Sequence, residues 1–387
     1  MGNMKWMANP YAGERPSDLI ELFSWEEAKR ARKFHESLPA YAETPLYSLG
    51  GLARSFGIGG LYVKDESERF GLHAFKGLGA SYALGRLHGG SGETVTFATA
   101  TDGNHGKGLA WAARELGQRA VVFLPAGSAK ERVDAIREQG ADARVTELNY
   151  DDTVRLAEEE AACNGWVLVQ ATAWTGYEKV PRLIMQGYLT LIDEAFGQLE
   201  EASAPPVTHL FLQAGVGSFA AAMAAYVAAR LGKDAPKIIV MEPDKADCFY
   251  RSALKGDGAA AEVGGDLDTM MAGLACGVPS PDAWAILKPL VSHFASCSDE
   301  VSTNGMRILS RPSAGDPRVV SGESGAAVAV GLLGGLTSVD REMLGLDASS
   351  VVLAVNTEGD TDPGNFRRIT GGMGARPQIE RFARRVE

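Results

Sequence analysis

Residues 208–231 read THLFLQAGVGSFAAAMAAYVAARL, and the expected fold follows from this stretch. Its first part, Thr208–Gln213, is apolar almost throughout, which is typical of a strand covered on both faces in a parallel sheet. A glycine turn comes next, and the alanine-rich segment Phe219–Leu231 then predicts a buried helix. A strand that passes through a tight turn into a helix is the building unit of α/β proteins.

The same pattern repeats along the chain. Further strands are predicted at Leu61–Lys64, Thr94–Ala98, Ala120–Leu124, Arg144–Glu147, Val167–Val169, Lys237–Glu242 and Ser350–Asn356. Helices are expected at Gly106–Leu116 and from Ser128, where Glu131 completes a capping-box pattern. The polar segment Gln198–Val207, with its Pro-Pro pair, is expected to be a linker or long loop. Strands that alternate with helices predict α/β architecture with right-handed crossovers.

Composition narrows the classes of function. The chain has 387 residues, enough for two or three domains, with 38 basic and 49 acidic side chains and a net charge of −11. Nucleic acids bind clustered cations, so this balance argues against a nucleic-acid partner. The N-terminus shows no apolar leader and no apolar run long enough to span a bilayer occurs, which predicts a cytoplasmic protein without a membrane partner. The cysteines include no CxxC pair and the histidines no HxxxH pair, so no metal site is expected.

The glycine turn is the first candidate binding site. Ala214–Ala220 reads AGVGSFA, in which backbone N–H groups and a helix N-terminus can enclose a phosphate. Taken alone, this is a G-x-G-x-x-A pattern, and the next strand ends at Glu242, where a ribose-binding carboxylate is expected. From this segment a dinucleotide, another phosphate ligand and a plain tight turn all stay open. A nicotinamide-dependent oxidoreductase is accordingly one hypothesis for the function.

A lysine in an apolar setting is the second candidate. Lys76 stands between Phe75 and the sequence GLG, at the start of an apolar helix. Partial desolvation and the positive end of the helix both favour the neutral amine, which can form a Schiff base. The alternative is a surface lysine whose stem covers the beginning of the helix.

A polar loop after the strand Thr94–Ala98 is the third candidate. Residues 99–106 read TATDGNHG, and hydroxyls, an amide and glycines at a helix N-terminus suit a carboxylate or an oxyanion. Asn104 can donate a hydrogen bond to a phenolate oxygen. Asp102 is either a general base or the N-cap of the following helix.

Together these segments resemble the pyridoxal 5′-phosphate (PLP) enzymes of fold type II, the class of the tryptophan synthase β-subunit. The motifs that carry the resemblance follow one another along nearly the whole chain: YVKDESERFGLHAFKGLG (62–79), TFATATDGNHGKGLAWAA (96–113), YDDTVRLA (150–157), WTGYEKVPRLIMQGY (174–188), QAGVGS (213–218), EPDKADCFYRS (242–252), MAGLACG (271–277), SGESGA (321–326) and NTEGDTDP (356–363). Any one of them is weak, but all of them together are specific. The resemblance favours the phosphate of PLP, rather than a dinucleotide, at the glycine turn.

The resemblance implies roles for single residues. Lys76 is expected to be the Schiff-base lysine, and Asp102 an acid–base group on the opposite face of the cofactor. The residues expected to bind PLP are Lys76, Phe75, Asn104, Gly215, Val216, Gly217, Ser218, Phe219, Glu323 and Thr357, with Asn104 on the phenolate oxygen and the Thr357 hydroxyl on the pyridine nitrogen. The residues expected at the substrate carboxylate are Thr101, Asp102, Gly103 and His105.

The resemblance also implies an activity and an architecture. The motifs are most similar to those of family members that act on 2,3-diaminopropionate, which predicts a lyase of amino-acid catabolism. It would remove ammonia by α,β-elimination, through an aminoacrylate that hydrolyses to pyruvate, and bases on two faces would allow L and D substrates. We expect two open twisted-sheet α/β domains with PLP in the cleft between them. Residues 1–85 and 201–387 would form the large domain, and 86–200 a small inserted domain that carries the substrate-carboxylate loop. A homodimer is expected as well.

One departure from the family bears on the substrate. The family pattern QDTAW is replaced here by QATAW (170–174), so at Ala171 a carboxylate able to pair with a distal ammonium is missing. The alternative is a PLP-dependent lyase or dehydratase for another β-substituted amino acid. Cys248 and Cys276 lie in two of the motifs, and we expect them to approach each other near the pocket entrance, where they could form a disulfide.

Overall fold

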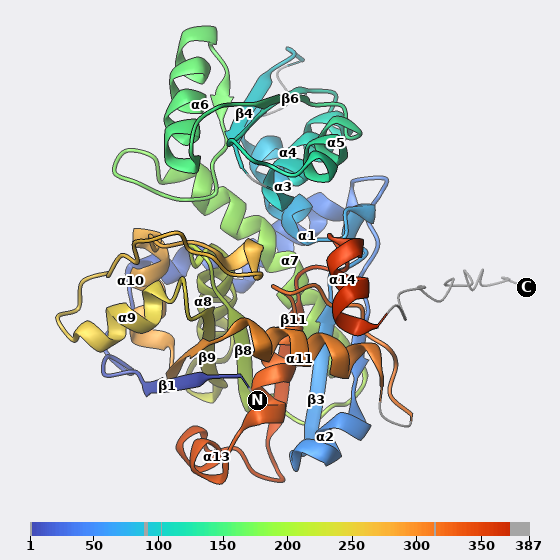
Figure 1. The fold of residues 1–387 in the computed structure, drawn as a ribbon, viewed down its shortest axis with the longest axis vertical. Helices are drawn as coiled ribbons and strands as arrows, with labels where there is room; N and C mark the ends of the chain where they lie inside the picture. The colour runs from blue at the N-terminus through green and yellow to red at the C-terminus, as the bar shows by residue number, and fades with distance from the viewer. Residues whose placement is uncertain (1, 89–91, 102, 313–314, 372–387) are drawn as a thin grey trace, which may run out of the picture.

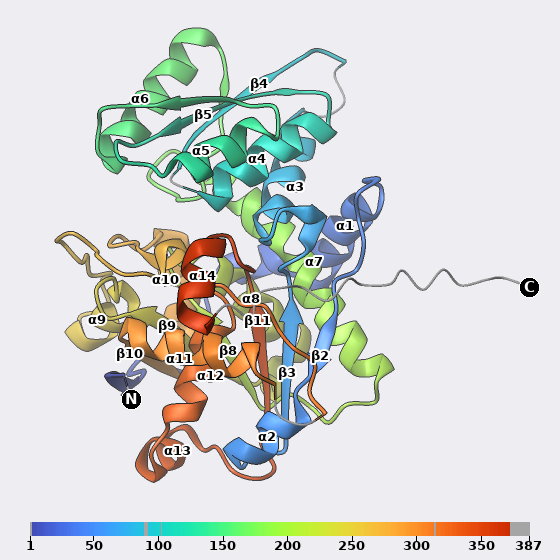
Figure 2. The same ribbon diagram turned by 45° about the vertical axis from the view of Figure 1, so that its right-hand side comes forward.

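The computed structural model describes residues 2–88, 92–101, 103–312 and 315–371. These residues form two β-sheets in two units, a larger and a smaller one, which Figures 1 and 2 show from two sides. The strands of the smaller sheet all come from the continuous segment 96–168, whereas the larger sheet is built from strands before and after that segment.

The larger sheet has seven strands in the described part of the chain. In spatial order they are β1 (Met4–Ala8), β10 (His293–Cys297), β9 (Lys237–Pro243), β8 (His209–Gln213), β11 (Val351–Asn356), β3 (Gly60–Asp65) and β2 (Leu46–Ser48). The five inner strands run parallel, and β1 and β2 pair antiparallel at the edges. β8 and β11 are buried along their whole length and are neighbours, so the residues that follow Gln213 and Asn356 emerge side by side.

Helices cover the larger sheet and join its strands. They are α1 (Trp25–Glu36), α2 (Gly50–Phe56), α8 (Ser218–Leu231), α9 (Cys248–Lys255), α10 (Pro281–Leu290), α11 (Asp299–Ser310), α12 (Ala327–Gly335), α13 (Ser338–Leu344) and α14 (Pro363–Thr370), with 3-10 turns at Asp18–Phe23, Arg69–Gly71, Gly232–Asp234 and Ala272–Leu274. The predicted alanine-rich helix is α8, which packs against α10. Among the described residues, no helix combines the length and the apolar character needed to cross a lipid bilayer.

The smaller sheet has four parallel strands. Their spatial order is β6 (Asp142–Val145), β5 (Arg119–Leu124), β4 (Thr96–Ala100) and β7 (Val167–Leu168). Its helices are α4 (Asn104–Glu115), α5 (Lys130–Arg137) and α6 (Tyr150–Asn164). α4 and α5 lie on the side of the sheet that faces the larger unit (Figure 2). Because α4 begins just beyond the carboxyl end of β4, its N-terminus occupies the place where open α/β sheets bind ligands.

Two helices connect the units. α3 (Lys76–His88) leads from the larger unit to the smaller one, and α7 (Lys179–Glu201) leads back (Figure 1). They pack against each other, and α7 also packs against α1 and α8. The expected linker Gln198–Val207 is therefore helical in its first part, since α7 continues to Glu201.

The predicted strands are all present, and none of their ends is displaced by more than two residues. The additional strands are β1, β2 and β10. The predicted capping box is wrong: α5 begins at Lys130 after Ala129, and no side chain caps it. The Ser128 hydroxyl donates instead to the carbonyl oxygen of Pro125 at 2.8 Å, so the preceding turn already satisfies it.

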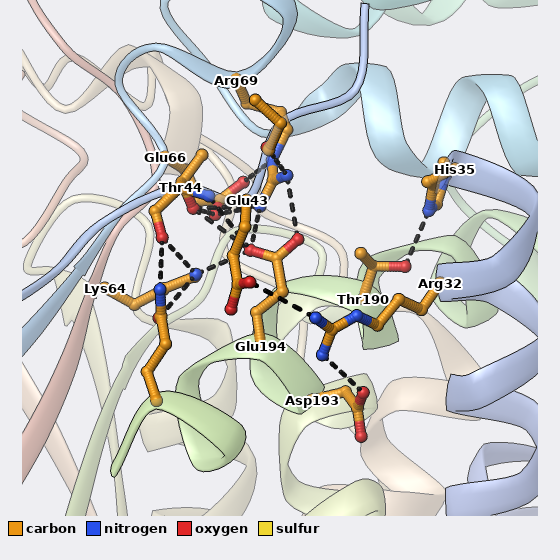
Figure 3. Close-up of polar contacts among 12 residues, drawn as sticks. Arg32, His35, Glu43, Thr44, Lys64, Glu66, Arg69, Thr190, Asp193 and Glu194 are labelled. Atoms are coloured by element: carbon orange, nitrogen blue, oxygen red, sulfur yellow. Dashed lines mark hydrogen bonds and ion pairs between the residues drawn. The ribbon is translucent and has the colours of Figure 1, made fainter. Parts of the chain in front are cut away.

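A buried ion network joins α7 to the segment before α3 (Figure 3). Glu194 pairs with Lys64 at 2.6 Å and with Arg69 at 2.7 Å, and Glu66 pairs with Arg69 at 2.7 Å. All four side chains are closed to solvent, and two cations balance two anions. Burial would raise the pKa of Glu194, but the charges of Arg69 and Lys64 outweigh it and hold that pKa well below its usual range. The network thus fixes α7 relative to the chain that leads to Lys76.

Candidate active site

Lys76 is the first residue of α3, at the junction of the two units. Its side chain is half-buried, with Nζ 5.0 Å from the ring centre of Phe75 and 5.7 Å from that of Tyr188. The amine therefore lies against two aromatic rings, which is the partly desolvated environment expected from the sequence.

Close packing fixes the helix turn that carries Lys76. A Cβ added to Gly108 of α4 would lie 2.9 Å from the carbonyl carbon of Lys76, so only glycine lets the two helices meet here. In the next residues of α3, the carbonyl oxygen of Leu78 lies 3.0 Å from Nε2 of His35, whose Nδ1 is 2.7 Å from the Thr190 hydroxyl (Figure 3 shows the latter bond). Burial lowers the pKa of His35 to about 3, so the neutral ring donates on one side and accepts on the other.

Phe75 connects the lysine with the glycine turn. Its ring centre lies 4.7 Å from that of Tyr188 and 5.1 Å from that of Phe219, near the start of α8. Burial raises the pKa of the Tyr188 hydroxyl, and the charge of Lys76 opposes this rise. Tyr188 was not expected at the site, although its position at the end of the motif WTGYEKVPRLIMQGY was the available signal.

The glycine turn, residues 214–218, links β8 to α8. Gly217 precedes the helix with a φ of +91°, a left-handed conformation that favours glycine. The carbonyl oxygen of Val216 accepts the N–H of Ser280 at 2.9 Å, which holds the turn in place. The first N–H groups of α8 have no acceptor within the helix and carry its positive dipole end, which is the arrangement that binds phosphate.

Replacing Gly217 by alanine should weaken binding of PLP, the phosphate ligand expected from the sequence, by at least about tenfold, because the turn would have to rearrange. The new Cβ would lie 2.3 Å from Cζ of Phe249 and 2.8 Å from Cβ of Ala283, on a backbone that disfavours any side chain. Gly264→Ala is the matched control, since a Cβ there meets no atom within 4 Å. Equilibrium dialysis measures both affinities, and equal affinities would contradict a phosphate site at this turn.

Asn104 opens α4 and bonds across to the larger unit. Its Nδ2 donates to Oε2 of Glu358 at 2.8 Å, and Oε1 of Glu358 accepts the backbone N–H of Ser324 at 3.0 Å. Burial, followed by the nearby charge of Glu358, raises the pKa of Glu323, and burial also raises the pKa of Glu358. Two buried carboxyl groups thus accompany Asn104, and Glu358 was not expected from the sequence, although it is adjacent to Thr357.

Thr357 follows β11 and meets the end of β8. Its hydroxyl donates to the carbonyl oxygen of Ser324 at 3.0 Å and accepts from Nε2 of Gln213 at 2.8 Å. Oε1 of Gln213 is buried and has no hydrogen-bond partner in the part of the chain that the structure describes. A polar group of a ligand beside the Thr357 hydroxyl would therefore lie close to polar atoms of Thr357 and Gln213, and not in an apolar pocket.

Thr101, Gly103 and His105 surround the N-terminus of α4. The Thr101 hydroxyl oxygen accepts the N–H of Gly103 at 3.1 Å. Nε2 of His105 lies 2.8 Å from the carbonyl oxygen of Val169, and burial lowers the pKa of His105 to about 4. Since this ring is neutral and already bonded, His105 would bind a carboxylate through its backbone N–H. Asp102, the expected second acid–base group, lies outside the described residues.

Ala171 lies where the two units meet. Its carbonyl oxygen accepts the hydroxyl hydrogen of Ser218 at 3.1 Å, so the smaller unit touches the glycine turn directly. The neighbouring Gln170 is turned away, since its side chain bonds to Thr99 and Ala100. The segment QATAW thus brings a backbone carbonyl to the site, and no carboxylate.

Glu242 has a structural role, which removes the support for a ribose site. Its carboxylate accepts the N–H groups of Phe249 and Tyr250 at 2.8 and 2.7 Å, at the start of α9. Burial raises the pKa of Glu242 to about 8. The residue therefore caps a helix and is not available to a dinucleotide.

Cys248 and Cys276 both lie beside Gly215, and neither forms a disulfide with another described cysteine. The Cys248 Sγ is 3.9 Å from the carbonyl oxygen of Gly215, and the Cys276 Sγ would be 3.2 Å from a Cβ on that glycine. The structure brings the two thiols to the same turn without joining them. Within the described ranges, no three His, Cys, Asp or Glu side chains are grouped as metal ligands.

Known proteins are similar to this chain over most of its length. The family described as "Pyridoxal-phosphate dependent enzyme" matches residues 38–358. A diaminopropionate ammonia-lyase of Escherichia coli (strain K12) is 49% identical over 370 residues, which cover 90% of this chain and 92% of the relative. Crystal structures of the Escherichia coli enzyme with an aminoacrylate-PLP azomethine reaction intermediate and with D-serine each give a TM-score of 0.89. Their identities are 46% and 45%, and the matches cover 96% of this chain and 97% and 98% of theirs.

Proposed function

Because this chain belongs to the pyridoxal-phosphate-dependent enzymes, and among them to the diaminopropionate ammonia-lyases, we propose that Lys76 holds the cofactor and takes the α-proton of the substrate. The chain is a PLP-dependent carbon–nitrogen lyase that acts on 2,3-diaminopropionate by α,β-elimination, and the nicotinamide hypothesis is wrong. The position of the Lys76 amine is the observation that supports this role. Its amine contacts Phe75, whose ring packs on Phe219 beside the glycine turn.

The residues of the site fit PLP. The glycine turn and the N-terminus of α8 suit its phosphate, and the amine of Lys76 suits its aldehyde. The Asn104 amide can donate to the phenolic oxygen. The Thr357 hydroxyl can donate to the pyridine nitrogen when its single hydrogen turns away from the carbonyl oxygen of Ser324. Support comes from Oε1 of Gln213, a buried atom beside Thr357 without a partner in the described part of the chain. Glu323 lies near Glu358 at the same site and is proposed to line the cofactor.

The chain's own residues move the protons of the elimination. PLP, when bound, supplies the electron sink that stabilises negative charge at the α-carbon. The amine of Lys76 takes the α-proton from one face, and we propose Asp102 as the base on the other. The β-amino group leaves in its protonated form: the bond from the β-carbon to this ammonium breaks, and its electron pair leaves with neutral ammonia. The released unsaturated product hydrolyses, so one 2,3-diaminopropionate and one water give one pyruvate and two ammonia.

We further propose that the substrate carboxylate is bound by the loop 99–106, through Thr101, Gly103 and the backbone N–H of His105. Residues 86–200 would act as the small domain that closes over it. The bonds from Asn104 to Glu358 and from Ser218 to Ala171 support closure, since each joins the two units across the site. A closed cleft would exclude water while charge develops on the substrate. Assembly as a homodimer and location in the cytoplasm stay predictions.

A spectrum and a stoichiometry test the function. The purified enzyme loaded with PLP should show a visible absorbance band that borohydride abolishes. It should release two ammonia for each pyruvate from 2,3-diaminopropionate, with both the D and the L isomer as substrates. Absence of the band would contradict the cofactor site. Turnover of serine without turnover of 2,3-diaminopropionate would instead favour a dehydratase.

A dehydratase that expels a neutral group is the second candidate, and Ala171 alone favours it. Ala171→Asp should raise the ratio of kcat/KM for 2,3-diaminopropionate over serine by about tenfold, because a carboxylate there can pair with a distal ammonium. Ala171→Asn is the matched control, with the same size and no charge. Equal ratios for the two variants would show that charge at this position does not select the substrate.

A further inference from the structure

Glu358 is a buried carboxyl group that has no part in the reaction described above. It follows Thr357 after β11 and is 5% exposed. Its backbone pairs with Ala74, close before Lys76, and its carbonyl oxygen accepts the N–H of Gly322 at 3.0 Å. The backbone of Glu358 is therefore held by the segment that leads to α3 and by the SGESGA segment.

Both carboxyl oxygens of Glu358 are engaged. Oε1 accepts the backbone N–H of Ser324 at 3.0 Å. Oε2 accepts from Nδ2 of Asn104 at 2.8 Å, and this donor comes from the smaller unit. One bond thus fixes the side chain within the larger unit, and the other reaches across the site.

The contact with Glu358 decides which end of the Asn104 amide faces it. An asparagine amide has a donor end and an acceptor end of nearly the same shape. A carboxylate only accepts, so the NH2 group must face Glu358, and a rotation by 180° would bring two acceptors together. The second N–H on the same nitrogen then stays available for another acceptor.

We propose that Glu358 is a positioning residue, which orients the amide of Asn104 so that its second N–H meets the phenolic oxygen of PLP. This inference rests on the proposed function, because it takes PLP as the ligand. Glu358 acts through Asn104, and without it the amide can rotate and turn its oxygen toward the cofactor.

The charges around Glu358 are compatible with this role. Glu323 approaches it from the SGESGA segment, and Arg132 from α5. Burial raises the pKa of both carboxyl groups, Glu358 adds to the rise at Glu323, and Arg132 opposes the rise at both. The N–H groups of Ser324 and Asn104 and the charge of Arg132 all favour the ionised form of Glu358, in which both carboxyl oxygens only accept.

A double-mutant cycle on the PLP-loaded enzyme tests the inference. Asn104→Ala should weaken PLP binding by about tenfold and shift the visible band. Glu358→Ala should reproduce most of both effects, and the double variant should lose no more than Asn104→Ala alone. Glu358→Gln should restore only part of the wild-type band, because its single amide oxygen can accept from Asn104 or from the Ser324 N–H but not from both.

A structural carboxylate provides the control. Asp316 accepts the N–H groups of Gly51 and Leu52 at 2.6 and 2.8 Å, at the start of α2. Asp316→Ala should therefore lower thermal stability and leave the visible band in place. If Glu358→Ala does not fold, Glu358→Met, which keeps the bulk and has no acceptor oxygen, takes its place in the cycle.

Three results would overturn the inference. They are a folded Glu358→Ala or Glu358→Met variant with the wild-type band and PLP affinity, losses that add up in the double variant, or unfolding of the Ala, Met and Gln variants alike. The last result would assign a purely structural role to Glu358. The borohydride-sensitive band of the wild-type enzyme tests the cofactor itself. Failure of the proposed function would therefore appear in the wild type, and failure of this inference only in the variants.

Discussion

Lys76→Ala should abolish the visible band of the PLP-loaded enzyme and lower kcat for 2,3-diaminopropionate by at least about a thousandfold. In the proposed mechanism, the substitution removes both the amine that attaches the cofactor and the base that takes the α-proton. The rings of Phe75 and Tyr188 lie beside this amine. Helix α3 contains no second lysine, so no other amine of this helix can replace it. Absorbance with and without borohydride, together with pyruvate release, measures both effects.

Lys179→Ala is the matched control for this variant. Lys179 is also the first residue of a helix, α7, but it is exposed to solvent. Its removal should leave both the band and the turnover unchanged. If the Lys76→Ala enzyme kept a borohydride-sensitive band, another amine would hold the cofactor and the assignment of Lys76 would be wrong.

Glu194→Ala should lower the free energy of unfolding by about 3–5 kcal/mol, which is the usual cost of removing one partner from a buried ion pair. Lys64 and Arg69 would be left closed to solvent with only Glu66 to balance them. Their desolvation, rather than the lost attraction alone, sets the size of the effect. Urea unfolding followed by tryptophan fluorescence measures it.

Glu36→Ala provides the comparison for Glu194→Ala. Glu36 pairs with Arg32 at 3.1 Å on the surface of α1, with about half of its side chain exposed to solvent. Exposed pairs contribute little, so the unfolding midpoint should hardly move. If both variants lost a similar free energy of unfolding, the buried ion network of Figure 3 would stabilise the protein no more than an exposed pair.

The central strands could be predicted because burial on both faces leaves an apolar run in the sequence. β8 and β11 are of this kind. β10 is equally buried, but its sequence HFASC contains polar side chains whose partners are distant. The Ser296 hydroxyl donates to Asp247 at 2.7 Å, a residue 49 positions away, and no local pattern announces such a bond.

The residues of the candidate site also divide into those with a local sequence signal and those that depend on distant contacts. Lys76 and the glycine turn carry local signals, since an amine or a turn at a helix start has a recognisable neighbourhood. The contact of Asn104 with Glu358 joins residues 254 positions apart, and it exists only because two units meet. Glu242 is a case in which the local signal misleads. Its position at a strand end suggested a ribose site, but packing turns its carboxylate toward the N-terminus of α9.

The bond from the Ser218 hydroxyl to residue 171 ends on a peptide oxygen, which every amino acid possesses. Mutation can therefore exchange the side chain at this position while the bond between the two units stays intact. If residue 171 selects the leaving group as proposed, single replacements there can change that preference without loss of this hydrogen bond.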